Sequence, residues 1–210
     1  DNVCTGTSAC FLQLESGSTI VRYNTFRDYR DSTGGKPDIT FRGAIRMQYD
    51  FCQHNRIYHN LFVDNERTIT NSSFRWQVFD NIFLNNIFFR NRQTVFLGFP
   101  DYLTKNRNFF RGNLMTGMRP DEKLIHLDRD EFTVSEAQER LGDLYRGNIE
   151  GDPLLVRDER GRYVALGKES VCVDRGLPLT VTAQAGAGTK VSVADALGFF
   201  DGAGMIPGDA

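Results

Sequence analysis

A short repeat is the feature of this sequence that most constrains its fold. Four segments share the pattern Asn-x-Phe-x-x-(Asn/Tyr), and they begin at Asn24, Asn60, Asn86 and Asn108. A unit this short cannot bury its own apolar side, so such units must stack on one another. Asn tolerates the left-handed backbone conformation, and its amide hydrogen-bonds to the backbone or to a neighbouring Asn. We therefore expect these four Asn residues to form one ladder at a turn, with the Phe residues of the repeats stacked inside: Phe26, Phe62, Phe88 and Phe110.

A second strand is predicted in each coil, upstream of the repeat. Short segments in which apolar and polar residues alternate occur at 11–15, 44–48, 74–78, 94–98 and 123–127. Alternation sends one set of side chains into the core and the other set to the outer face of a parallel sheet. The outward set is expected to include Arg46, Gln48, Arg75, Gln77, Phe96, His126 and Asp128.

These repeats resemble a known family. The segment Phe83-Leu-Asn-Asn-Ile-Phe-Phe-Arg-Asn91 is similar to the repeats of right-handed parallel β-helix proteins of the pectate-lyase-like superfamily. Two later segments, Asn148-Ile-Glu-Gly-Asp-Pro-Leu-Leu155 and Ser170-Val-Cys-Val-Asp-Arg-Gly176, resemble those with which such proteins finish their coils. The resemblance implies an all-β chain, a right-handed parallel β-helix of about five coils. It implies no single reaction, because lyases, hydrolases, epimerases and non-catalytic adhesins share this scaffold.

The chain divides into a coil region and an extension. We expect residues 1–178 to form the coils, with a short lateral helix near 133–141 that is capped by Thr133 or Ser135 and stopped by Gly142. Residues 179–210 are rich in Ala, Gly, Thr and Val, which predicts a β extension resembling the start of an incomplete small module. Residues 1–10 contain no capping helix, so we expect earlier coils or an additional chain to cover that end.

Composition excludes several classes of function. Lys plus Arg number 25 and Asp plus Glu number 27. The chain therefore lacks the excess of basic residues that would indicate nucleic-acid binding. No apolar run approaches the roughly 18 residues that membrane insertion requires. Of the four cysteines, Cys4 and Cys10 are close enough to form a small-loop disulfide or to remain thiols, whereas Cys52 and Cys172 lie far apart.

The outer face supplies the candidate site residues. A uronate lyase needs a charge-neutralising group and a base, for which the candidates are Arg46, Arg75 and His126. The candidates for substrate binding are Gln48, Gln77, Phe96 and Asp128; the alternative is that all of these are ordinary solvated side chains. No cofactor and no metal site are predicted. The acidic group Asp128, Asp130 and Glu131 is a weak candidate for calcium, because it lacks the Gly and the closing Glu of a calcium loop.

Two classes of function remain open at this point. The resemblance favours a secreted or extracellular protein, in the periplasm or at the cell surface, that acts on or binds polysaccharide. If it is an enzyme, it is a polysaccharide lyase or a glycoside hydrolase, although the carboxylate pair of a glycosidase is missing. The alternative is a non-catalytic structural or adhesive subunit of a surface layer, sheath or fibre. An enzyme would show convergent Arg, His and carboxylates along the outer sheet, whereas an assembly protein would show apolar contacts at its ends.

Overall fold

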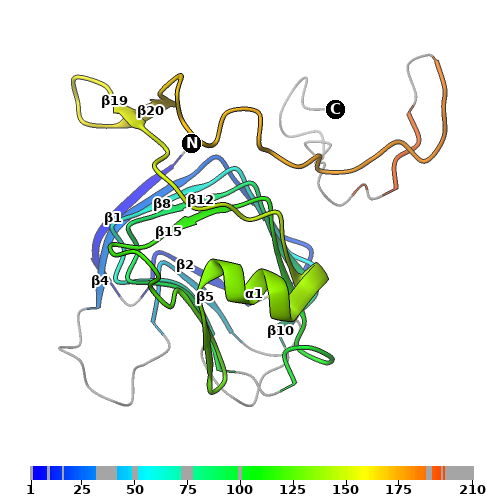
Figure 1. Ribbon diagram of the computed structural model, residues 1–210, viewed down its shortest axis with the longest axis horizontal. Coiled ribbons are helices and arrows are strands. Elements are labelled where there is room, and N and C mark those ends of the chain that lie inside the picture. Colours follow the sequence, from blue (N-terminus) through cyan, green and yellow to red (C-terminus); the bar gives the residue numbers. More distant parts are fainter. Residues whose placement is uncertain are drawn as a thin grey trace.

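The computed structural model of the chain is mostly β and its larger sheets are mostly parallel (Figure 1). It describes residues 2–8, 10–15, 17–31, 42–48, 52–71, 78–98, 101–187, 191–194 and 196. Among these residues no helix is long and apolar enough to cross a membrane. The predicted all-β class is confirmed, with one short α-helix in the described part of the chain.

Three large sheets surround the core. One five-stranded sheet has the order β1 (Val3–Ser8), β4 (Thr25–Asp31), β8 (Leu61–Val63), β12 (Ile87–Phe89), β15 (Leu114–Thr116). The other has the order β18 (Tyr145–Arg146), β14 (Asn108–Arg111), β11 (Asn81–Leu84), β7 (Arg56–Tyr58), β3 (Ile20–Arg22). The six-stranded sheet has the order β17 (Asp130–Phe132), β16 (Ile125–Leu127), β13 (Gln93–Leu97), β9 (Arg67–Asn71), β5 (Ile45–Met47), β2 (Leu12–Leu14). A small parallel pair joins β6 (Cys52–Gln53) to β10 (Val78–Phe79).

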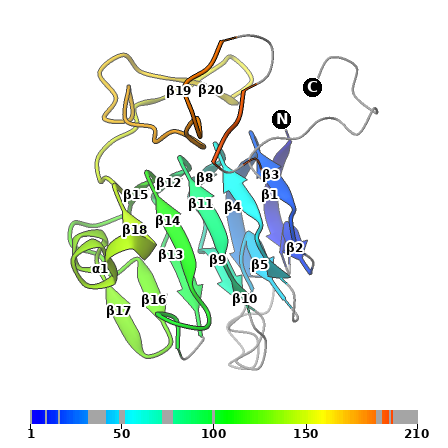
Figure 2. The ribbon, with the colours of Figure 1, turned by 90° about the vertical axis from the view of Figure 1, so that its right-hand side faces the viewer.

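The chain adds one strand to each large sheet in turn. The order β2, β3, β4 is followed by β5, β7, β8, then by β9, β11, β12 and by β13, β14, β15. Neighbouring strands in these sheets are parallel, except that β16 and β17 form an antiparallel hairpin. Figure 2 shows the successive strands side by side, with β1, β2 and β3 at one end of the stack. This topology is consistent with a solenoid-like fold.

The other end of the stack is occupied by α1 (Val134–Leu141), whose N-cap residue is Thr133 (Figure 2). Thr133 and Glu136 form a capping box, in which each side chain accepts a hydrogen bond from the other residue's backbone amide. The buried face of the helix is Val134, Ala137 and Leu141. A short 3-10 helix, η2 (Gly142–Leu144), follows it.

Stacked aromatic rings fill the core. The rings of Phe26, Phe62 and Phe88 lie nearly parallel, with centroids 4.9 and 4.7 Å apart. A second stack consists of Phe83, Phe110 and Tyr145, with centroids 4.3 and 5.0 Å apart. The prediction that Phe110 continues the first stack is therefore wrong: Met115 is the residue in register with Phe88.

Asn residues form three ladders at the turns. The longest runs through Asn2, Asn24, Asn60, Asn86, Asn113 and Asn148, and each Asn Oδ1 accepts from the backbone and side-chain amides of the preceding member. The second joins Asn55, Asn81 and Asn108, and the third joins Asn65 and Asn91. Asn24, Asn60 and Asn86 share one ladder as expected, but Asn108 lies in the neighbouring one. The pattern places the fourth repeat five residues out of register, because Asn113, and not Asn108, follows Asn86 in this ladder.

One predicted strand is in the wrong place. In the third coil the strand of the six-stranded sheet is β9, not the segment 74–78. Ile69 of β9 pairs with Ile45 of β5 and with Val95 of β13, so β9 fills the expected position in the sheet. Residues 72–77 lie outside the described residues, and Val78 begins β10.

For Cys4 and Cys10 the sequence left open a disulfide or two thiols, and the structure does not contain the disulfide. Cys4 is a free thiol in β1 and packs against the core, whereas the Cys10 thiol lies 3.8 Å from Gln13 Oε1. No Cys4–Cys10 disulfide forms between these two described residues. Cys52 is fully buried, and burial raises the pKa of its thiol to about 12.

The last part of the described chain lies outside the stack. An antiparallel hairpin of β19 (Leu155–Arg157) and β20 (Tyr163–Leu166) lies above the first five-stranded sheet (Figure 2). Further on, Leu177 is fixed to Asn85 by two hydrogen bonds, from Asn85 Nδ2 to the Leu177 carbonyl at 2.7 Å and from Leu177 N to Asn85 Oδ1 at 2.8 Å. Within the predicted extension 179–210, the described residues form one isolated antiparallel bridge between Thr182 and Val193.

Candidate functional site

The outer face of the six-stranded sheet carries one row of side chains in register. Ile45, Ile69, Val95 and Ile125 are fully buried in the core, so alternation turns their neighbours outward. The strand registers place the outward residues side by side in the order Gln13, Arg46, Thr70, Phe96, His126, Glu131. Thr70, which the sequence analysis did not identify, occupies the third position of this row, although its neighbours cover it completely.

Arg46 and Gln48 lie at the β5 end of the row. Both side chains are partly buried. Within the described residues, Arg46 Nε and Gln48 Oε1 have no hydrogen-bond partner. A buried polar atom without a partner is costly, because its lost hydration is not replaced. The two atoms are themselves shielded from solvent, so only the exposed remainder of each side chain can meet a polar group that approaches this face.

Phe96 and His126 lie side by side on β13 and β16. Their ring centroids are 5.9 Å apart and the rings are tilted by 45°. His126 is fixed on both sides: Nε2 lies 2.9 Å from the Lys123 carbonyl, and Nδ1 lies 3.2 Å from Glu131 Oε1. The partly exposed ring of Phe96 and the fixed imidazole of His126 together form a platform. Phe96 is its apolar half and His126 is its polar half.

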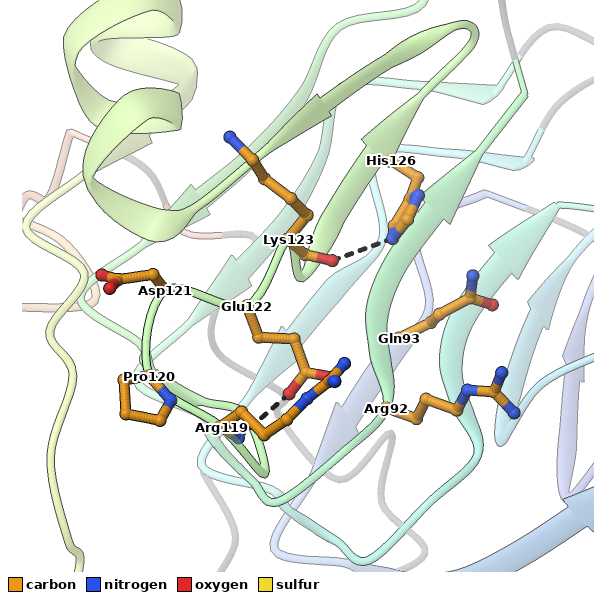
Figure 3. A pocket seen from close by; sticks show the side chains of 8 residues that line it. All are labelled: Arg92, Gln93, Arg119, Pro120, Asp121, Glu122, Lys123 and His126. Atoms are coloured by element: carbon orange, nitrogen blue, oxygen red, sulfur yellow. Dashed lines mark hydrogen bonds and ion pairs between the residues drawn. The ribbon is translucent and has the colours of Figure 1, made fainter.

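A cavity of about 460 Å³ adjoins this platform (Figure 3). Arg92 and Gln93, at the start of β13, form one side of it, and the segment from Arg119 to Lys123 forms the other. His126 lies where the cavity meets the outer face of the sheet (Figure 3). The cavity residues other than His126 were not among the sequence-predicted candidates.

The charged side chains that line the cavity differ in how many contacts they make with the rest of the protein. Glu122 Oε2 accepts from the backbone amides of Met118 and Arg119, at 2.8 and 3.3 Å, so this carboxylate holds the turn together. Lys123 points away from His126 and forms an ion pair with Glu136 (Figure 3). That ammonium and the Thr133 backbone amide lower the pKa of Glu136 to about 2.

Two arginines on opposite sides of the cavity extend into solvent. The side chain of Arg92 is 71% exposed and lies 3.9 Å from Glu66, and that of Arg119 is 80% exposed and lies 3.5 Å from Glu122. Ion pairs this long and this exposed contribute little to stability. Arg92 and Arg119 can therefore turn toward an anionic ligand at small cost.

Of the remaining sequence-predicted residues, the structure places only Asp128. Asp128 is exposed at the turn between β16 and β17, with a φ of 54°, and its amide donates to the Leu97 carbonyl. Arg75 and Gln77 lie outside the described residues. Of the predicted set, the structure thus brings together Phe96 and His126, with Arg46 and Gln48 farther along the same face.

Among the described residues there is no cluster of three or more His, Cys, Asp or Glu side chains that could hold a metal ion. The acidic group at Asp128, Asp130 and Glu131 is divided by its contacts, since Asp130 accepts from the Tyr102 hydroxyl and Glu131 contacts His126. The described side chains that meet at this face are therefore aromatic and hydrogen-bonding groups, namely Phe96 and His126.

Comparison of the chain with protein-family models, with curated proteins and with solved structures finds no significant match. The functional conclusion therefore depends on the geometry of this face.

Proposed function

We propose that this protein is a right-handed parallel β-helix of the pectate-lyase-like kind. The support is the parallel pairing of successive strands in three sheets, the Asn ladders at the turns and the stacked core rings. The repeat Asn-x-Phe-x-x-Asn accounts for both the ladders and the stacks, and it is the motif by which the sequence resembles that superfamily.

The proposed function is binding of polysaccharide along the outer face of the six-stranded sheet, outside the cell or at its surface. One observation carries it: a row of side chains from Gln13 to Glu131, interrupted at the surface by the buried Thr70, crosses all six strands and meets a cavity at His126. Parallel strands present such groups at steps of about 4.8 Å. A rigid row of this kind can follow an extended chain with little loss of conformational freedom.

The chemistry of the row suits an acidic glycan. Phe96 provides an apolar surface for a sugar ring. Arg46, together with Arg92 and Arg119 at the cavity, can form charge-assisted hydrogen bonds with uronate carboxylates. We assign these residues to binding. Catalysis by a lyase or hydrolase is a separate outcome of the experiment below.

The test is calorimetric binding to a panel of acidic and neutral polysaccharides, with release of unsaturated products and reducing ends followed in parallel. We expect the wild type to bind an acidic glycan and Arg46→Ala to weaken that binding roughly 10- to 100-fold, the effect of removing a hydrogen bond to a charged group. Phe96→Ala should weaken binding to acidic and neutral chains alike.

The matched control is Arg160→Ala, which removes an arginine from the turn between β19 and β20, on the opposite side of the molecule (Figure 1). This variant should bind like the wild type. If Arg46→Ala and Arg160→Ala bind equally well, the glycan does not lie on the outer face of the six-stranded sheet. If the wild type binds no member of the panel, the proposal is wrong.

A second candidate function is that of a structural or adhesive subunit. The observation in its favour is that β1, β2 and β3 are the edge strands of the three large sheets and lie at the same end of the stack (Figure 2). Edge strands present unpaired backbone groups that pair readily with another chain. Sedimentation velocity distinguishes the two functions: ordered multimers without glycan binding would favour the subunit, and a monomer that binds glycan would favour the first proposal.

A further inference from the structure

The outer face of the other five-stranded sheet, β18-β14-β11-β7-β3, has a different chemistry. Its strand registers align Arg22, Tyr58, Leu84, Arg111 and Arg146 in one row. A second row aligns Ile20, Arg56, Ile82 and Phe109. This face thus alternates guanidinium groups with apolar and aromatic side chains.

A cavity of about 350 Å³ lies over this face. Tyr58, Ile82 and Leu84 form its apolar floor, and the segment 177–181 forms the opposite wall together with Ala194. The two hydrogen bonds between Asn85 and Leu177 hold that segment in place. The cavity therefore has a rigid floor and a fixed wall from a distant part of the chain.

Three arginines line this cavity: Arg56, Arg111 and Arg146. Two of them share one carboxylate, because Arg111 Nη2 lies 2.9 Å from Asp143 Oδ2 and Arg146 Nη1 lies 3.2 Å from Asp143 Oδ1. The pair of guanidinium groups thus carries one positive charge more than Asp143 neutralises. Arg56 adds a third guanidinium, which donates to the Asp80 carbonyl at 3.5 Å.

Arg111 is the more enclosed of the two guanidinium groups. Its side chain is 21% exposed. Burial lowers the pKa of Arg111 from its ordinary value; Asp143 opposes that change, and the positive charge of Arg146 adds to it. An anion in the cavity would relieve the repulsion between the two guanidinium groups and strengthen the charged form of both.

We propose that this cavity is a binding site for a small organic anion in which a carboxylate or sulfonate is attached to an apolar ring. The ring lies on the floor formed by Tyr58, Ile82 and Leu84, and the anionic group reaches the arginines at the rim. Arg146 is the accessible partner, because its side chain is 62% exposed and its link to Asp143 is the longer of the two. The site lies on a different sheet from Arg46 and His126, so it does not depend on the proposed polysaccharide face.

Three probes separate the two parts of this proposal. Naphthalene-2-sulfonate has the ring and the anion, inorganic sulfate has the anion alone, and 2-naphthalenemethanol has the ring alone. Isothermal titration of the full chain with each probe measures the contribution of each part. We expect the sulfonate to bind at least tenfold more tightly than either of the other two, because only it engages both the floor and the rim.

Two variants locate the binding. Arg146→Gln and Arg56→Gln should each weaken sulfonate binding about tenfold, the effect of one lost charge-assisted hydrogen bond. The matched control is Arg107→Gln, which removes a half-exposed arginine that pairs with Asp80 and does not line the cavity. It removes the same charge, so it corrects for a general change in net charge. Thermal melts confirm that each variant is folded.

Three results would overturn the proposal. One is equal binding by the wild type and both cavity variants. Another is an equal loss in Arg107→Gln, which would indicate attraction by overall charge. The third is equal affinity for the sulfonate and the alcohol, which would show that the arginines take no part. Loss of polysaccharide binding in Arg46→Ala would leave this site unaffected, so failure of either proposal is recognised separately.

Discussion

Removal of the Asn86 side chain tests the principal ladder at its centre. Asn86 is 1% exposed. Its Oδ1 accepts from the backbone N and the side-chain Nδ2 of Asn60, both at 3.0 Å. Its Nδ2 donates to the Ile57 carbonyl at 2.8 Å and to Asn113 Oδ1 at 3.1 Å. Asn86→Ala deletes all four bonds and leaves the buried Asn60 amide without its acceptor.

The magnitude follows from these bonds. An orphaned buried amide costs about 1–3 kcal/mol, and the lost bond to the Ile57 carbonyl adds about 1 kcal/mol. The side-chain amide of Asn60 keeps two other acceptors, the Val21 and Tyr58 carbonyls, so it adds little. We expect Asn86→Ala to reduce the free energy of unfolding by about 2–4 kcal/mol. For a chain of this size that lowers the melting temperature by about 4 to 16 °C.

Differential scanning calorimetry or a urea titration measures this loss. The matched control is Asn2→Ala, at the exposed end of the same ladder, where the side chain donates to Asn24 Oδ1 and the ladder loses one outer bond. That change should cost under about 0.5 kcal/mol. Equal melting temperatures for Asn86→Ala and Asn2→Ala would refute the argument that the ladder stabilises the fold from within.

Three further predictions concern the core, a histidine and a thiol. Phe88→Ala should cost about 3–5 kcal/mol in urea titrations, because it opens a cavity between the Phe62 ring and Met115, and the half-buried Phe89→Ala should cost less than half as much. Burial lowers the pKa of His59, so the unfolded chain takes up its proton first and stability falls as pH drops below about 6.5. His59→Asn suits the φ of 54° and should lose less melting temperature than the wild type between pH 7.5 and 5.5; an equal loss would contradict this. Because the pKa of Cys52 is about 12, about one thiol in 10,000 is ionised at pH 8, and iodoacetamide should modify Cys52 only after unfolding, as peptide mass analysis would show.

The repeat predicted the ladder and the Phe stack for three of its four copies. The fourth copy is out of register because Asn108 satisfies the pattern, whereas Asn113, five residues later, is followed by Met115 where the pattern has Phe. The sequence holds a signal that resolves this: Asn55, Asn60 and Asn65 are also spaced by five, as are Asn81, Asn86 and Asn91. Each Asn of such a set belongs to a different ladder, so Asn108 and Asn113 correspond to the first two members.

The same spacing accounts for the misplaced strand. β9 begins two residues after Asn65 and β13 begins two residues after Asn91, so the third ladder marks where this strand starts. Segment 74–78 alternates equally well, and alternation alone cannot choose between two segments of one long connection. As a result Thr70, not Arg75 or Gln77, takes the third place in the outer row. The cavity at His126 depends on how the segment before β16 folds back, which no short motif encodes.

The Asn ladder also makes the molecule extensible. In the middle of the ladder each Asn donates to the next Asn in the same way. Asn60, for example, donates to Asn86, which lies 26 residues later in the chain. A tandem duplication of residues 60–85 would therefore give each new group the partner that its original already has. At the last rung, Gln138 of α1 supplies its side-chain oxygen to the amide of Asn148, where another Asn would otherwise stand. Length is thus a variable that evolution or an engineer can change in whole coils, while the helix that terminates the stack stays the same.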